Sequence, residues 1–158
     1  MIGEDTGNNL RLLSCLIMIV AFLFCSTSYA DSRLDNCLSY YDEIVSALES
    51  EGVSPDYFYL AVCESGCKNV ESNKGAHGFF QMTRPTFNSF KSTDCSDIYD
   101  IKCNTIAAAR YIKHLQKRFK HMNILIYAYN MGGTNLIKRG SPTKEARGLS
   151  LCVMKYLK

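Results

Sequence analysis

Six cysteines between residues 31 and 158 constrain the fold of this chain more than any other feature. An even number of cysteines in a small exported domain indicates a disulfide framework. Their order alone leaves the pairing open, although the short separation of Cys95 and Cys103 suggests a local bond. The six are Cys37, Cys63, Cys67, Cys95, Cys103 and Cys152.

Cys63 and Cys67 belong to the stretch VCESGCKN, which raises the question of a metal site. Zinc sites use grouped C-x-x-C or Cys/His spacing, and C-x-x-x-C is a poor match. The three histidines of the chain are scattered. A bond between Cys63 and Cys67 would distort a regular helix, so disulfides to distant cysteines are favoured. We therefore expect disulfides, no metal and no cofactor.

The first 30 residues have the pattern of a secretory signal. Arg11 precedes an apolar run at 12–25, and small residues up to Ala30 form an A-x-A-like cleavage site. The run is shorter than the ~20 residues that a membrane-spanning helix needs. We expect cleavage after Ala30 and a periplasmic or secreted domain of residues 31–158 without a membrane span. An uncleaved signal that anchors the protein is the alternative.

Apolar residues in the rest of the chain recur mostly at steps of three and four, which is typical of amphipathic helices. No repeat or interdomain linker interrupts residues 31–158. The expected fold class is mainly α, in one disulfide-stabilised domain with little or no sheet. Helices are predicted at 34–48, 55–65, 85–90, 102–120 and 122–131 and after Ser141-Pro142, with a loop at 66–78.

Glu64 lies on the apolar side of the helix predicted over 55–65. It follows Leu60 by four residues and Ala61 by three, so the three side chains share a face. Removal of a carboxyl from water raises its pKa, and a carboxyl that stays protonated near neutral pH suits a general acid. A structural hydrogen bond at the helix end is the alternative interpretation.

Further motifs follow Glu64 in a fixed order. The set is Glu64-Ser65 at a helix end, Gly78-Phe79-Phe80-Gln81, a helix containing residues 108–112, and Ala128-Tyr129-Asn130. Each motif alone is weak, but four of them in this order are hard to obtain by chance. Together they resemble the lytic transglycosylases with a goose-type lysozyme-like catalytic domain. The resemblance covers about residues 50–135.

The resemblance implies roles for residues at the two ends of this set. Glu64 matches the catalytic acid/base, and Ser65 matches a serine that positions that carboxylate or the sugar. Tyr129 matches a tyrosine that orients the glutamate or contacts the sugar, and Asn130 matches the asparagine beside it. Two structural alternatives remain: Tyr129 as a core residue with a satisfied hydroxyl, and Asn130 as a helix C-cap.

The middle motif implies a sugar-binding wall. Gly78 and Gln81 match residues that line the cleft in the family. Phe79 and Phe80 replace the usual Leu-Met, and Phe80 is expected to contact substrate as part of a more aromatic wall, unless both rings pack in the core. Gln81 has its own structural alternative, which is to satisfy backbone groups of the loop.

Most glycosidases use two carboxylates, yet the four motifs contain only Glu64. The resemblance implies that Glu64 alone acts as acid and then base, so that peptidoglycan is cleaved to a 1,6-anhydro end without water. One alternative is a true lysozyme, with Glu71, Asp94, Asp97 or Asp100 as the base. Another alternative is a non-catalytic glycan-binding module.

The expected partners are peptidoglycan strands. By analogy, proteins of a secretion or conjugation apparatus are also expected, and a phage wall-opening role is equally compatible with the motifs. A net charge of +3 is mild, and no nucleic-acid partner is expected.

Overall fold

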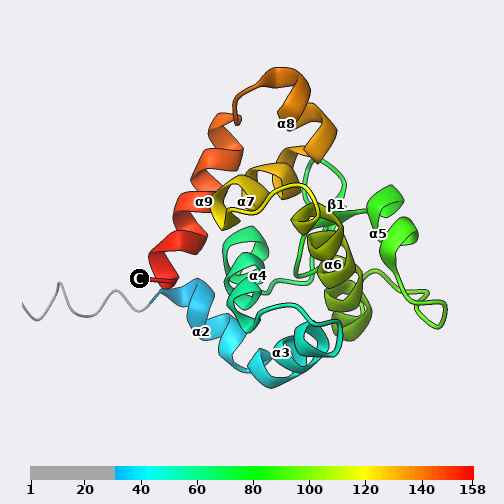
Figure 1. Cartoon of the computed structure of the whole chain (residues 1–158). Helices are drawn as coiled ribbons and strands as arrows, with labels where there is room; N and C mark the ends of the chain where they lie inside the picture. Colours follow the sequence, from blue (N-terminus) through cyan, green and yellow to red (C-terminus); the bar gives the residue numbers. More distant parts are fainter. Residues whose placement is uncertain (1–30) are drawn as a thin grey trace, which may run out of the picture. The chain divides into compact units, whose positions relative to one another are not determined.

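The computed structural model describes residues 31–158, and Arg33–Lys158 form one compact unit (Figure 1). The predicted signal at residues 1–30 lies outside the described residues. The helices are α2 (Ser32–Leu38), α3 (Tyr41–Ser50), the 3-10 turn η1 (Pro55–Tyr57), α4 (Phe58–Ser65), α5 (Arg84–Phe90), α6 (Ile101–Gln116), α7 (Met122–Met131), α8 (Gly133–Arg139) and α9 (Lys144–Tyr156). The expectation of a mainly helical domain is confirmed.

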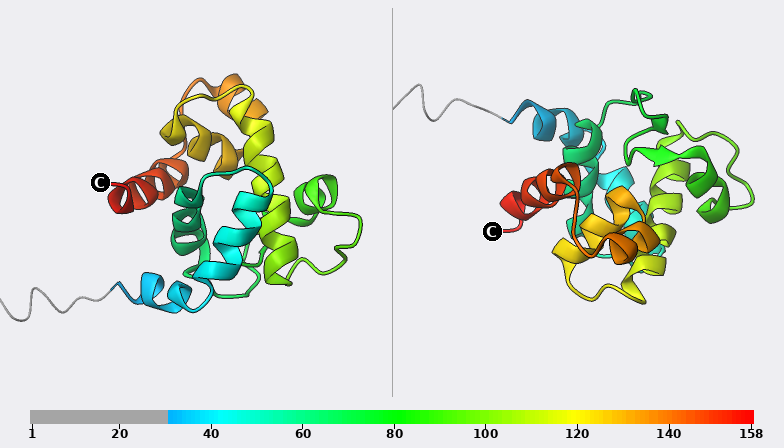
Figure 2. Two further views of the ribbon diagram at one scale, coloured as in Figure 1. Left: turned by 60° about the horizontal axis from the view of Figure 1, so that its bottom comes forward. Right: turned by 90° about the horizontal axis from the view of Figure 1, so that it is seen from above.

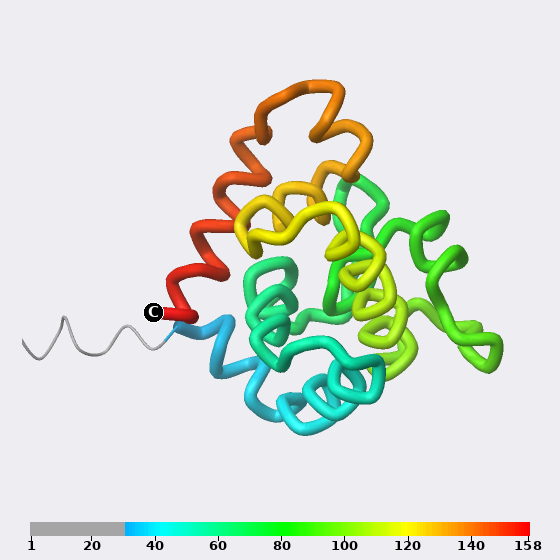
Figure 3. Tube along the Cα trace, in the orientation of Figure 1, coloured from blue at the N-terminus to red at the C-terminus, as the bar shows by residue number. Residues whose placement is uncertain are grey.

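Helix α4 lies among the other helices, as two further views show (Figure 2). It packs against α9 and α3, while α7 contacts α6, α8 and α9. Figure 3 traces the path of the chain around α4. The fold therefore places the end of α4 beside segments from the second half of the chain.

Within residues 31–158, no helix combines the length and the apolar character needed to cross a membrane.

Within residues 31–158, the sheet is confined to two short antiparallel strands, β1 (Ala76–His77) and β2 (Met82–Thr83), in which Ala76 lies opposite Thr83. The turn 78–81 connects them. A single bridge joins Glu71 to His77. This small element agrees with the prediction of little sheet, and it positions the motif Gly78-Phe79-Phe80-Gln81.

The helix predicted over 34–48 is wrong as one helix, because the chain breaks at Ser39 and Tyr40 into α2 and α3. The break lets Cys37 turn into the core and lets the Tyr40 ring pack edge-on against Phe79 at 4.9 Å. Leu38, an apolar residue within the predicted helix, is 56% exposed. The tertiary contacts of Cys37 and Tyr40 therefore outweigh the apolar periodicity that favours one continuous helix.

The segment predicted as one helix over 55–65 forms η1 followed directly by α4. The Ser54 hydroxyl accepts a hydrogen bond from the Asp56 amide, and Pro55 occupies the first helical turn. Gly66 ends the helix in the left-handed conformation with φ of 62°. Helix α8 was not among the predicted helices. The chain ends α7 at Met131 and starts α8 at Gly133.

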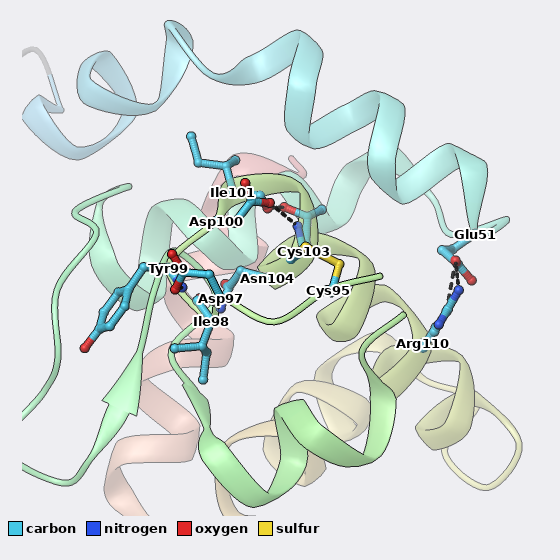
Figure 4. Close-up of a disulfide and its surroundings, with 11 residues drawn as sticks. Glu51, Cys95, Asp97, Ile98, Tyr99, Asp100, Ile101, Cys103, Asn104 and Arg110 are labelled. Atoms are coloured by element: carbon cyan, nitrogen blue, oxygen red, sulfur yellow. Dashed lines mark hydrogen bonds and ion pairs between the residues drawn. A yellow bond between two sulfur atoms is a disulfide. The ribbon is translucent and has the colours of Figure 1, made fainter. Parts of the chain in front are cut away.

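All six cysteines of the described region form disulfides. The pairs are Cys37–Cys67, Cys63–Cys152 and Cys95–Cys103. The local bond expected between Cys95 and Cys103 is confirmed (Figure 4). The expectation that Cys63 and Cys67 bond to distant cysteines is also confirmed. These two bonds fasten the end of α4 to α9 and to α2.

Candidate active site

Glu64 is the penultimate residue of α4, and its partly buried side chain lines a cavity of about 630 Å³. Burial raises the pKa of this carboxyl from 4.5 to about 8, and the negative charge of Glu145 adds to the rise. Glu64 is therefore largely protonated at neutral pH. A protonated carboxyl that opens into a cavity can donate its proton to a bound ligand.

Most of the residues that line the cavity are uncharged, and many of them carry amide or hydroxyl groups. Among the described residues, the charged side chains in the lining are those of Glu64, Lys74 and Glu145. Amides and hydroxyls in a concave surface suit a ligand that presents hydroxyl and amide groups, such as an acetylated sugar. The lining residues are Glu64, Ser72, Asn73, Lys74, Ala76, Gln81, Met82, Thr83, Thr86, Tyr111, Tyr129, Asn130, Met131, Gly132, Asn135 and Glu145.

Three helices hold the turn 78–81 against the end of α4. From α4, Ser65 Oγ donates to the Phe79 carbonyl at 2.8 Å. From α7, the Tyr129 hydroxyl donates to the Phe80 carbonyl at 2.8 Å. From α6, Asn104 Oδ1 accepts from the Phe80 amide at 2.9 Å. The turn is thus fixed relative to Glu64 by side chains that are far apart in sequence.

Asn104 is the residue of this network that the sequence analysis missed. It is buried, and its Nδ2 donates to the Ile98 carbonyl at 2.9 Å and to the His77 carbonyl at 3.3 Å. A signal existed, because Asn104 falls on the apolar stripe of α6 with Ala108 and Ile112. A polar side chain on a core face needs partners, and here the partners are the turn and its flanks.

Gly78 is required where it contacts Asn104. Its φ is 72°, and a Cβ atom would lie 2.5 Å from Asn104 Nδ2 and 2.9 Å from the Ile98 carbonyl oxygen. Gly75 has the same φ, with nothing within 4 Å of a Cβ position. Substitutions at the two glycines therefore separate two costs in stability: that of a left-handed backbone conformation, and that of the steric clash with Asn104.

Replacing Gly78 by alanine is expected to destabilise the domain by more than the same change at Gly75. Both variants carry the strain of a left-handed alanine, about 1–2 kcal/mol, and only Gly78→Ala also displaces Asn104. Thermal melts of the two variants measure the difference. Equal melting temperatures would show that the Asn104 contact does not hold the turn.

Four of the seven expected site residues line the cavity: Glu64, Gln81, Tyr129 and Asn130. The other three, Ser65, Gly78 and Phe80, do not. Ser65 and Gly78 shape and hold the turn. The Phe80 ring is fully buried, so the expected contact between its side chain and substrate is not supported.

Gln81 and Tyr129 also have structural partners, as the alternative interpretations anticipated. Gln81 has φ of 47°, and its Nε2 donates to the carbonyls of Gly78 at 2.9 Å and Val70 at 3.1 Å. Burial, helped by the charges of Glu64 and Tyr111, raises the pKa of Tyr129 well above its ordinary value. Tyr129 therefore stays protonated and keeps its hydrogen bond to the turn.

The acids considered as a second catalytic carboxylate lie outside the cavity lining. Glu71 Oε2 is 3.7 Å from His77 Nδ1. Asp97 accepts a hydrogen bond from the Tyr99 amide, and Asp100 caps α6. Asp94 is likewise absent from the lining.

The carboxylate that shares the cavity with Glu64 is Glu145, from the first turn of α9. Nothing in the local sequence around Glu145 indicates this, since only the fold brings α9 to the cavity. Among residues 31–158, no cluster of three or more His, Cys, Asp or Glu is placed to hold a metal ion.

Comparison with known proteins agrees with this geometry. A family model described as the transglycosylase SLT domain matches residues 43–149. No curated protein matches the chain. The matched segment contains Glu64, the turn 78–81, Asn104, Tyr129 and Glu145. Because the match spans most of the chain and the whole of the candidate site, the chain belongs to the transglycosylase SLT domain family.

Proposed function

We propose that this protein is a peptidoglycan lytic transglycosylase that cleaves the β-1,4 bond between N-acetylmuramic acid and N-acetylglucosamine and leaves a 1,6-anhydro end. The observation that carries the proposal is the position of Glu64, whose pKa burial raises to about 8, in a cavity lined mostly by uncharged residues. Family membership supports the general class of activity.

The proposed reaction uses Glu64 twice. The protonated carboxyl donates its proton to the glycosidic oxygen, and the bond from that oxygen to C1 of the muramyl sugar breaks. The resulting Glu64 carboxylate then takes the proton from the C6 hydroxyl of the same sugar, whose oxygen forms a bond to C1. The proton count closes, no water is consumed, and Glu64 returns to its protonated form.

Hydrolysis is the second candidate, and Glu145 is the observation that favours it. A water molecule between two carboxyls is the arrangement of an inverting glycosidase. However, Glu145 is ion-paired with Lys74 and its side chain is largely exposed, so this carboxylate is not held in place to position a water beside Glu64. The geometry therefore favours the intramolecular attack.

The mass of the products separates the two reactions. Purified protein is incubated with isolated cell walls, and the released muropeptides are weighed. Anhydro-muropeptides, each lighter than the hydrolytic product by one water, are expected. Products that carry the added water would identify a lysozyme, and binding without any product would identify a glycan-binding module.

We further propose that the protein acts outside the cytoplasm, where it opens the wall locally, for example for a secretion or conjugation apparatus. Three disulfides support the compartment, because such bonds persist in oxidising environments. Recovery of the native protein in the cytoplasmic fraction, with free thiols, would contradict this placement.

A further inference from the structure

The rim of the cavity carries one pair of opposite charges. Lys74 Nζ and Glu145 Oε2 lie 2.5 Å apart, and their side chains are 73% and 58% exposed. The loop at 72–75 supplies the lysine and the first turn of α9 supplies the glutamate. The pair therefore joins two separate segments at the edge of a cavity whose other lining residues are mostly uncharged.

The backbones beneath both charges are fixed. Ser72 Oγ accepts hydrogen bonds from the Lys74 amide at 3.4 Å and from the Ala76 amide at 3.0 Å. Thr143 Oγ1 caps α9 by accepting from the Ala146 amide at 3.1 Å. Each charged group is thus an exposed side chain on a backbone that hydrogen bonds hold in place.

The internal ion pair is easily exchanged. Exposed pairs contribute little to stability, because solvent screens them and ordering two long side chains costs entropy. A ligand that offers a carboxylate to Lys74 and an ammonium to Glu145 can replace the internal contact at small cost. An ion pair that closed the cavity permanently would have to be buried, and these two side chains are exposed.

Peptidoglycan, the substrate of the proposed function, carries both negative and positive charges in its peptide stems. The sugar backbone of peptidoglycan offers mainly hydroxyl and acetamido groups, which match the neutral cavity lining. The peptide stems that project from the muramyl sugars carry free carboxylates and the amino group of a diamino acid. The uncharged cavity lining therefore matches the sugars of a glycan strand, and the opposite charges at the rim match the peptide stems that remain attached to it.

We propose that Lys74 and Glu145 make the site selective for stem-bearing glycan strands over strands stripped of their peptides. Lys74 pairs with a stem carboxylate and Glu145 with the stem ammonium, in exchange for their own contact. This inference rests on the proposed function, because it assumes that the glycan occupies the cavity at Glu64.

The test compares two substrates: glycan strands with their stems, and the same strands after an amidase has removed them. The measured quantity is the ratio of kcat/KM for the two. Two exposed ion pairs correspond to a ratio of about two- to tenfold in favour of stems. Lys74→Met and Glu145→Gln are each expected to move this ratio toward one. A change in the proton affinity of Glu64 cancels in the ratio, because both substrates use the same acid.

A charge-swapped variant separates recognition from a structural contact. Lys74→Glu combined with Glu145→Lys can rebuild the internal ion pair but reverses the charges offered to a stem, so the ratio should stay near one. The matched control is the pair Glu51–Arg110, at 2.8 Å and outside the cavity lining (Figure 4). Glu51→Gln with Arg110→Met should keep the wild-type ratio.

Binding gives a readout that does not depend on cleavage. In a Glu64→Gln background, calorimetry compares stem-bearing with stripped strands, and the rim substitutions should reduce the difference in Kd as they reduce the kinetic ratio. An unchanged preference in Lys74→Met and Glu145→Gln, or its recovery in the charge-swapped variant, would overturn the proposal. A wild type that binds stems selectively but cleaves nothing would overturn only the proposed function.

Discussion

Glu64→Gln is expected to lower glycan cleavage by at least ~10³-fold, the largest effect of any single substitution in the cavity. A single general acid or base typically contributes 10²- to 10⁴-fold, and Glu64 is proposed to serve as both. Glutamine keeps the size and polarity of the side chain but has no transferable proton. Release of anhydro-muropeptides from cell walls, measured over time for the variant and the wild type, checks the loss.

The stability of the same variant provides the control against misfolding. The pKa of Glu64 is raised from 4.5 to about 8 by folding, so the folded state holds a proton that the unfolded chain releases. The free energy of unfolding therefore falls as the pH rises from about 4.5 to about 8. Glutamine removes this loss. Glu64→Gln should melt at least as high as the wild type at pH 8, although it is inactive.

The pH dependence of the wild type follows from the same group. Above a pH of about 8 the carboxyl loses the proton that it must donate, so kcat/KM should fall there, provided that the isolated wall substrate is unchanged. Retention of most activity by Glu64→Gln, with an unaltered product mass, would assign the acid to another residue.

The sequence predicted the helices best where both ends carry chemical signals. The segment from Ser54 to Gly66 has a capping serine, a proline at its start and a left-handed glycine at its end, and it folds as expected. The helix predicted over 34–48 had only periodicity. Its apolar stripe was overridden by the disulfide of Cys37 and by the packing of Tyr40, which are contacts with distant parts of the chain.

The site was predictable only in part, for a related reason. Glu64 could be found because its burial follows from neighbours on its own helix. Ser65 and Tyr129 were expected to position Glu64 or to contact a sugar. In the structure, their hydroxyls donate hydrogen bonds to the turn 78–81. Lys74 and Glu145 could not be found, because their partnership joins a loop to a helix across much of the chain.

Removal of the Cys63–Cys152 disulfide is expected to have the largest effect on stability. The bond joins the residue next to Glu64 to α9 and closes a loop with a sequence separation of 89. The chain-entropy model assigns such a loop about 4–5 kcal/mol, against about 2–3 kcal/mol for a loop as short as that of Cys95–Cys103, whose separation is 8. The double variant Cys63→Ala, Cys152→Ala should therefore melt on the order of 10 °C below the wild type or lower.

Comparison with Cys95→Ala, Cys103→Ala separates the general cost of losing a disulfide from the specific cost at the site. Only the Cys63–Cys152 bond fastens the end of α4 to the helix that carries Glu145. Its loss should lower kcat even at temperatures where the variant is fully folded, because the acid and its surroundings are no longer held together. If the two double variants lose equal activity in their folded states, the bond beside Glu64 serves stability alone.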